Sequence, residues 1–102
     1  MQYESKLASE QADKLFSAIL TLESREECYR FFEDLCTIKE LHDLAQRFEV
    51  AKKLKDGVTY QEIAQKTGAS TATISRVNRC LHYGAGGYQL ALERLKDRED
   101  KL

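Results

Sequence analysis

The chain contains no proline, and this absence constrains its fold more than any other feature of the sequence. Proline is the strongest helix breaker, so glycine is the main breaker left. The five glycines fall at Gly57, at Gly68 and within residues 84–87. Between these breaks, apolar residues recur three and four positions apart, without the alternation of strands. The sequence therefore predicts an all-α fold of about six helices, with residues 1–102 forming a single domain.

Helix starts are marked by Ser or Thr followed three residues later by Glu, the capping-box pattern. It occurs at Ser24, Thr37 and Thr59, and Ser70 is a further candidate N-cap. Glycine readily adopts positive φ, so helix ends are expected near Gly57 and at Gly68. The predicted helices cover about residues 7–22, the segment after Ser24, the segment from Thr37 to Asp56, residues 60–67, residues 71–83 and residues 88–102.

The charge is distributed unevenly along the chain, although the net charge is only −1. Residues 1–50 hold 6 Lys and Arg against 11 Asp and Glu, whereas residues 51–82 hold 6 against 2. Local positive charge favours a polyanion such as DNA, and a solvated charged face is the ordinary alternative. No apolar run approaches the roughly 20 residues of a membrane span, and no signal peptide is recognisable. We expect a cytoplasmic protein that does not bind membranes.

The three cysteines, Cys28, Cys36 and Cys80, are widely spaced and form no CxxC pattern. We expect free thiols. Only His42 and His82 could join them as metal ligands or catalytic bases, and no known metal or nucleophile signature is present. We therefore expect no metal site, no cofactor and no enzymatic activity.

Residues 60–79, YQEIAQKTGASTATISRVNR, satisfy the internal demands of a helix-turn-helix, which we place at about residues 59–80. Ala64 offers a small side chain where the second helix crosses the first, and Gly68 can take the positive φ of the turn. Three apolar residues are spaced to anchor both helices to the rest of the domain, namely Ile63, Ile74 and Val77. A plain αα-hairpin with a Ser/Thr-rich turn is the structural alternative.

The second helix of this motif begins with short side chains, which would let its first turn approach base edges in the major groove. Free backbone N–H groups at the helix start can bind phosphate, two arginines add charge, and Gln61 can reach backbone or base. The candidate DNA-binding residues are Gln61, Ser70, Thr71, Ala72, Thr73, Ser75, Arg76 and Arg79. The pattern predicts a sequence-specific regulator of transcription that binds double-stranded DNA. A protein-interaction module is the alternative.

These motifs resemble the Trp-repressor superfamily, and within it the Trp-repressor-related YerC/YecD type. The resemblance runs from about residue 35 to residue 81 and is strongest in LAQRFEVAKKLKDG and YQEIAQKTGASTATISR. It implies an intertwined, all-helical homodimer whose two reading heads enter successive major grooves, and we expect a repressor. The apolar N-terminal helices also favour a core shared between two subunits over a compact monomer.

The resemblance further implies an effector pocket between the core helix and the reading helix, where the Trp repressor holds an indole between two arginines. The matching positions are Arg47 and Arg76. Val77 stands where the Trp repressor has glycine and Cys80 where it has serine, so we expect no response to tryptophan. The candidate pocket residues are Thr37, Arg47, Thr73, Arg76, Val77 and Cys80. DNA binding without any small-molecule effector is the alternative.

Both arginines of this pocket have a second interpretation. Arg47 can form an ordinary surface or interface salt bridge, for instance with Asp43, one helical turn earlier. Arg76 either faces DNA, lines the pocket, or does both.

Overall fold

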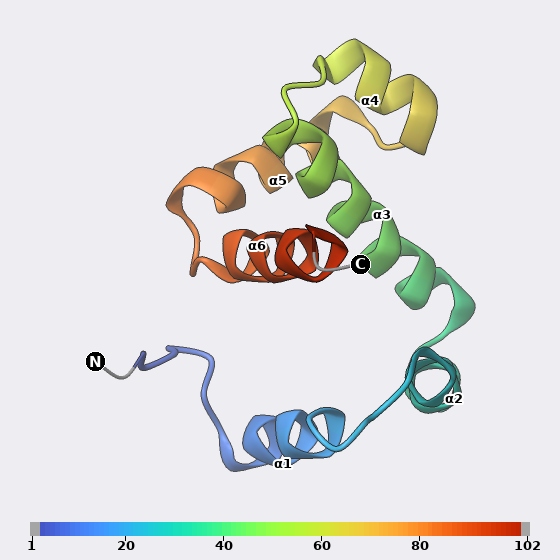
Figure 1. Ribbon diagram of the computed structural model, residues 1–102, viewed down its shortest axis with the longest axis vertical. Coiled ribbons are helices and arrows are strands. Elements are labelled where there is room, and N and C mark those ends of the chain that lie inside the picture. Colours follow the sequence, from blue (N-terminus) through green and yellow to red (C-terminus); the bar gives the residue numbers. More distant parts are fainter. Residues whose placement is uncertain (1–2, 101–102) are drawn as a thin grey trace. The chain divides into compact units, whose positions relative to one another are not determined.

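The computed structural model describes residues 3–100, and these residues form six helices and no β-strand (Figure 1). The predicted all-α class is confirmed. The helices are α1 (Glu10–Ile19), α2 (Arg25–Leu35), α3 (Ile38–Lys55), α4 (Tyr60–Thr67), α5 (Thr71–Tyr83) and α6 (Gly87–Asp100). Residue contacts divide the chain into an N-terminal unit that ends at Ile38 and a C-terminal unit that begins at Lys39. Within residues 3–100, no helix has the length and apolar character needed to cross a membrane.

Helix α1 is shorter at both ends than the expected span of residues 7–22. The Ser9 side chain accepts a hydrogen bond from the Ala12 N–H at 3.0 Å and so fixes the helix start. At the other end, the Thr21 hydroxyl donates to the Ala18 carbonyl at 2.6 Å, beyond the last helical residue. Side-chain capping, which the apolar periodicity does not report, sets both limits.

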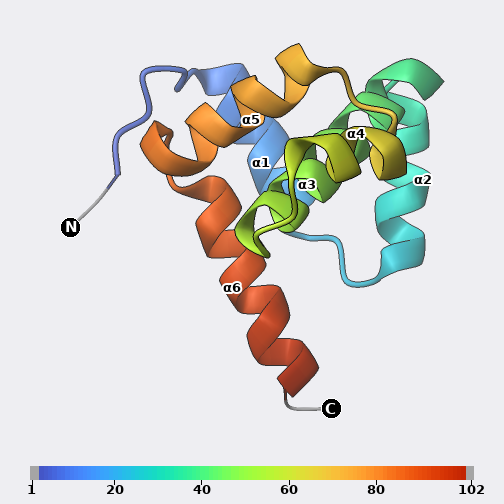
Figure 2. The same ribbon diagram turned by 90° about the horizontal axis from the view of Figure 1, so that it is seen from above.

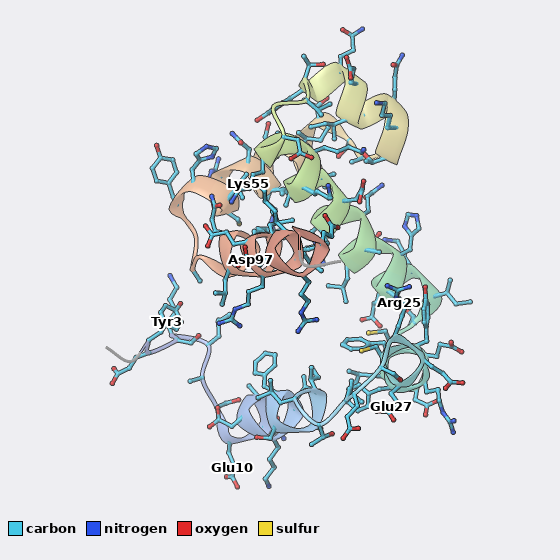
Figure 3. All side chains as sticks on the ribbon, viewed as in Figure 1. Tyr3, Glu10, Arg25, Glu27, Lys55 and Asp97 are labelled. Atoms are coloured by element: carbon cyan, nitrogen blue, oxygen red, sulfur yellow. The ribbon has the colours of Figure 1, made fainter. Side chains whose placement is uncertain are left out.

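Helix α2 begins as predicted, because the Ser24 side chain accepts a hydrogen bond from the Glu27 N–H at 3.1 Å. The Glu27 carboxylate (Figure 3) accepts from the Glu23 N–H at 2.8 Å instead of from the N–H of the cap residue. Neither α1 nor α2 buries a side chain. Their largest exposed apolar side chains are Phe16, Tyr29 and Leu35, and Leu20 is also exposed just after α1. The N-terminal unit therefore supplies no hydrophobic core of its own.

The C-terminal unit contains the hydrophobic core, to which α3, α4, α5 and α6 all contribute. The buried cluster consists of Val50, Ala51, Ile63, Ala69, Ile74, Val77 and Leu92. Ile63, Ile74 and Val77 are at most 1% exposed, so the predicted anchors of the helix-turn-helix are confirmed. A core drawn from four helices fixes the position of α4 and α5 relative to α3.

Helix α6 follows α5 after a short turn (Figure 2). In this turn Gly86 has a φ of +85°. It starts at Gly87, one residue before the expected start, and residues 101–102 of the expected segment lie outside the described residues. Lys55 of α3 (Figure 3) lies 3.9 Å from the Glu93 carboxylate of α6. This contact joins the end of α3 to the middle of α6.

Candidate nucleic-acid interface

Helices α4 and α5 form a helix-turn-helix at the predicted residues (Figure 1). Thr59 caps α4 by accepting a hydrogen bond from the Glu62 N–H at 3.3 Å. Gly68 ends α4 in the left-handed conformation, with a φ of +75°. A Cβ at Gly68 would meet only the Gln46 side chain, at 3.9 Å. The turn therefore needs glycine for its backbone conformation and not for space.

The turn between the two helices is held by α3 and by its own threonine. Gln46 of α3 donates a hydrogen bond to the Thr67 carbonyl at 3.0 Å. The Thr67 hydroxyl donates to the Ile63 carbonyl at 2.7 Å and accepts from the Ala69 N–H at 3.1 Å. Ala69 is itself buried in the core. These contacts give α5 a defined direction relative to α3.

The start of α5 presents backbone donors to solvent. The Ser70 hydroxyl accepts a hydrogen bond from the Thr73 N–H and donates one to the Thr73 hydroxyl, both at 3.1 Å. The first of these hydrogen bonds caps the start of α5, and a contact of Ser70 with DNA stays a prediction. Thr71 and Ala72 are the first two residues of the helix, where backbone N–H groups have no acceptor within the helix. Such N–H groups and the helix dipole together favour an anion at this end of α5.

The side chains of α5 separate into a buried and an exposed face. Ile74, Val77 and Leu81 face the core, and Thr73 is half-buried. The exposed candidates on α5 are Ser70 at the cap, Thr71, Ala72, Ser75, Arg76 and Arg79, and Gln61 is exposed in the first turn of α4. With 3.6 residues per turn, Ala72, Ser75 and Arg79 project away from the core, whereas Arg76 lies toward one side.

A surface hollow of about 440 Å³ is lined by two candidate DNA-binding residues and by three residues that are not among the candidates. Ser75 and Arg79 line it together with Asn78, His82 and Tyr83. The His82 Nδ1 atom lies 2.9 Å from the Asn78 carbonyl oxygen, which fixes the imidazole ring against the helix. The three residues stand three, seven and eight positions after Ser75, so helical periodicity continued along the exposed face could have identified them.

Within residues 51–82, the lysines form ion pairs and the arginines do not. Each of the four lysines in this segment lies within 4 Å of a carboxylate. The pairs are Lys52–Asp56, Lys53–Glu49, Lys55–Glu93 and Lys66–Glu62. Across residues 3–100, no ion pair involves Arg76 or Arg79. Within residues 51–82, the positive charge without a paired carboxylate is therefore located on α5.

Three of the candidate effector-pocket residues act on one side chain, Tyr88 of α6. Burial raises the pKa of Tyr88, the Cys80 thiol raises it further, and the positive charges of Arg47 and Arg76 oppose this rise. The Tyr88 ring itself packs against Phe48 of α3 and lines a hollow with Cys80 of α5. Tyr88 was not among the sequence candidates, because its position relative to the two arginines depends on how α6 packs.

The other candidate pocket residues are placed differently. Val77 is 1% exposed and belongs to the core cluster, beside the half-buried Thr73. Thr37 is exposed in the N-terminal unit. Within residues 3–100, no cluster of three or more His, Cys, Asp or Glu side chains could hold a metal ion.

The expected alternative partner of Arg47 pairs elsewhere. Asp43 lies 2.8 Å from the Lys39 ammonium, and this hydrogen bond lowers the pKa of Asp43. The ion pairs of the described residues include no Arg47–Asp43 contact. The suggested Arg47–Asp43 pair is therefore wrong for the described residues, whereas an interface salt bridge of Arg47 stays a prediction.

Comparison with known proteins gives matches over most of the chain. The family model described as Trp repressor protein matches residues 10–96. The chain is 58% identical over 94 residues to the uncharacterized protein YerC of Bacillus subtilis, covering 92% of this chain and 90% of that protein. It is 34% identical over 76 residues to the Trp operon repressor homolog of Chlamydia trachomatis serovar D, covering 70% and 81%.

The fold also matches that of a solved structure. The crystal structure of a TrpR like protein from Eubacterium eligens superposes with a TM-score of 0.86 at 58% identity, covering 89% of this chain and 94% of that chain. Sequence and fold lead to the same assignment over nearly the full length, including the helix-turn-helix. The chain belongs to the Trp repressor family.

Proposed function

We propose that this protein is a transcriptional regulator, acting as a repressor, that binds specific sequences of double-stranded DNA through α4 and α5. The observation that carries the proposal is the exposed face of α5, where short side chains adjoin two arginines that have no paired carboxylate. Membership of the Trp repressor family agrees with such a role. The protein acts in the cytoplasm, with residues 1–102 working as one domain.

The first turn of α5 enters the major groove. Ala72 and Ser75 are short enough to bring the helix close to base edges, where the serine hydroxyl donates or accepts and the alanine methyl contacts thymine. Arg79 and Arg76 bind phosphates on either side, and the N–H groups of Thr71 and Ala72 add a further phosphate contact. The turn that holds α5 to α3 supports this docking, because a fixed helix loses little freedom on binding.

The functional form is a homodimer. Helices α1 and α2 bury no side chain, and apolar side chains such as Leu20 (84% exposed) and Ile38 (92% exposed) are open to solvent. Two short helices without a core are marginal in water, so a second subunit that covers them accounts for their apolar character. The helix-turn-helix of each subunit then contacts one of two half-sites about one DNA turn apart.

The experiment that tests the proposal is selection of bound DNA from a random pool by the full chain. We expect a palindrome whose half-sites are centred about 10 base pairs apart. A palindrome of this kind supports the function and the dimer together. Recovery of no preferred sequence, with a monomer in analytical ultracentrifugation, would contradict both.

Binding to the selected DNA should weaken steeply with salt, and the arginines of α5 should account for part of the slope. Each phosphate contact contributes about 0.9 to the slope of log K against log salt. The double substitution Arg76→Ala with Arg79→Ala should therefore lower the slope by about 2. The matched control is Arg94→Ala with Arg98→Ala, two exposed arginines on α6. Equal slopes for the two double variants would favour a protein-interaction module.

L-tryptophan is not the effector. Val77 occupies buried volume in the core next to Ile74, where the family pocket for an indole would need room. Titration calorimetry of the full chain with L-tryptophan should give no heat of binding at micromolar ligand. Saturable binding in that range would show that the Val77 side chain does not exclude the indole.

A further inference from the structure

Tyr88 joins three helices of the C-terminal unit. It belongs to α6, is half-buried, and packs against the core cluster. Its ring lies beside Phe48 of α3, with centroids 6.5 Å apart and ring planes inclined by 34°. It also lines a hollow of about 360 Å³ next to Cys80 of α5, a hollow otherwise formed by the turn residues Gly84, Ala85 and Gly87. The ring is thus positioned where a movement of α5 relative to α3 would disturb its contacts.

Two cations act on the polar end of the same side chain. The charges of Arg47 and Arg76 counteract the rise that burial causes in the pKa of Tyr88. In the described part of the chain, neither arginine forms an ion pair with a carboxylate. A partly buried aromatic ring that packs on Phe48 of α3 and lines a hollow with Cys80 of α5 has the chemistry of a bound phenol, except that this phenol is covalently part of α6.

We propose that Tyr88 is a built-in aromatic ligand: its ring packs between Phe48 of α3 and the core, next to Cys80 of α5, and holds α5 in the orientation that binds DNA. A regulator that needs a small molecule binds DNA only in the fraction of molecules that carry the molecule, and its apparent affinity falls by that fraction. A side chain that is permanently packed between the helices removes the dependence of DNA affinity on a bound small molecule. The inference rests on the proposed function and extends it, because it makes DNA binding independent of an effector.

The test is the Tyr88→Ala substitution combined with 4-methylphenol, which carries the phenol ring that the substitution deletes. If the competent orientation of α5 falls to about a tenth of molecules, DNA affinity should fall about tenfold. Millimolar 4-methylphenol should restore the affinity of Tyr88→Ala and should leave that of the wild-type protein unchanged. The non-aromatic analogue 4-methylcyclohexanol should restore less.

Three further variants separate positioning from mere stability. Tyr88→Phe keeps the ring and should bind DNA within about threefold of wild type, whereas Tyr88→Leu keeps apolar bulk without the ring and should resemble Tyr88→Ala. Tyr3→Ala removes a tyrosine (Figure 3) that is 71% exposed, and it should leave DNA affinity unchanged. If Tyr88→Ala unfolds, as judged by circular dichroism, the comparison of Tyr88→Leu with Tyr88→Phe replaces it.

The outcomes distinguish this inference from the proposed function. If wild type binds DNA and the folded Tyr88→Ala or Tyr88→Leu variant binds it with the same affinity, the inference is overturned and the proposed function stands. Weak binding by Tyr88→Ala that 4-methylphenol does not improve also overturns it, because Tyr88 would then be an ordinary packing residue. If wild type binds no DNA, the function fails, and calorimetry of 4-methylphenol with Tyr88→Ala decides separately whether a ligand site opens.

Discussion

The Ala72→Glu substitution is expected to lower DNA affinity by about a hundredfold or more without lowering the stability of the protein. Ala72 is the second residue of α5 and is exposed on the face proposed to enter the major groove. A carboxylate there would meet phosphates and base edges, and like-charge contacts at an interface cost several kcal/mol. In the free protein the same carboxylate lies near the positive end of the helix dipole, which favours it by ~0.3–1 kcal/mol. Fluorescence anisotropy with the selected DNA and thermal unfolding measure the two effects.

The matched control for Ala72→Glu is Gln11→Glu. Gln11 is the second residue of α1 and is also exposed, so both substitutions place a glutamate at the same position of a helix. Gln11→Glu should have the same small effect on stability and should leave DNA affinity within about threefold of wild type, because Gln11 does not belong to the helix-turn-helix and a single exposed charge is screened at physiological salt. Equal losses of DNA affinity in both variants would contradict the proposed contact between the first turn of α5 and DNA.

The Ile74→Ala substitution is expected to lower the free energy of unfolding by ~2–5 kcal/mol. Ile74 is fully buried and lies in the cluster that joins α5 to α3 and α4. Small domains have a total stability of roughly 5–15 kcal/mol, so the loss should shift the urea midpoint strongly and abolish DNA binding near the new melting temperature. The measurement compares variants at one protein concentration, since the stability of an oligomer depends on it.

The neighbouring substitution Ser75→Ala provides the control for Ile74→Ala. Ser75 is exposed on the opposite face of the same helix, so its removal should change the free energy of unfolding by no more than ~0.5 kcal/mol. DNA affinity should nevertheless decrease for Ser75→Ala at 25 °C. A loss below ~1 kcal/mol for Ile74→Ala would be incompatible with its position in the core.

The helix-turn-helix could be predicted from sequence because local side chains determine its limits. Thr59 and Ser70 accept hydrogen bonds from their own helices, and Gly68 supplies the positive φ between them. These features act within four residues and do not depend on distant parts of the chain. The expected boundaries of α4 and α5 therefore agree with the structure.

The limits of α1 and the surroundings of Tyr88 could not be predicted in the same way. The apolar periodicity of residues 7–22 continues beyond both ends of α1, and the cap residue Ser9 lacks the Glu three residues later that completes a capping box. The neighbours of Tyr88 come from α3 and α5, up to 41 positions away in the chain, counting from Arg47 to Tyr88. Which residues meet across three helices is decided by the crossing of those helices, and a single sequence carries no direct record of it.

For the DNA-binding function proposed here, the carboxylates that pair with the four lysines of residues 51–82 have a consequence for the search of a genome. Non-specific attachment to DNA grows with the number of cations free to replace counterions, and a genome offers millions of wrong sites. Because each of these lysines has a carboxylate within 4 Å, and because residues 1–50 carry a net charge of −5 that includes the Glu49 partner of Lys53, these segments attract DNA less than their lysine content suggests. Such a protein spends little time on the wrong sites, and its occupancy of the right ones is limited by the quality of the fit at α5.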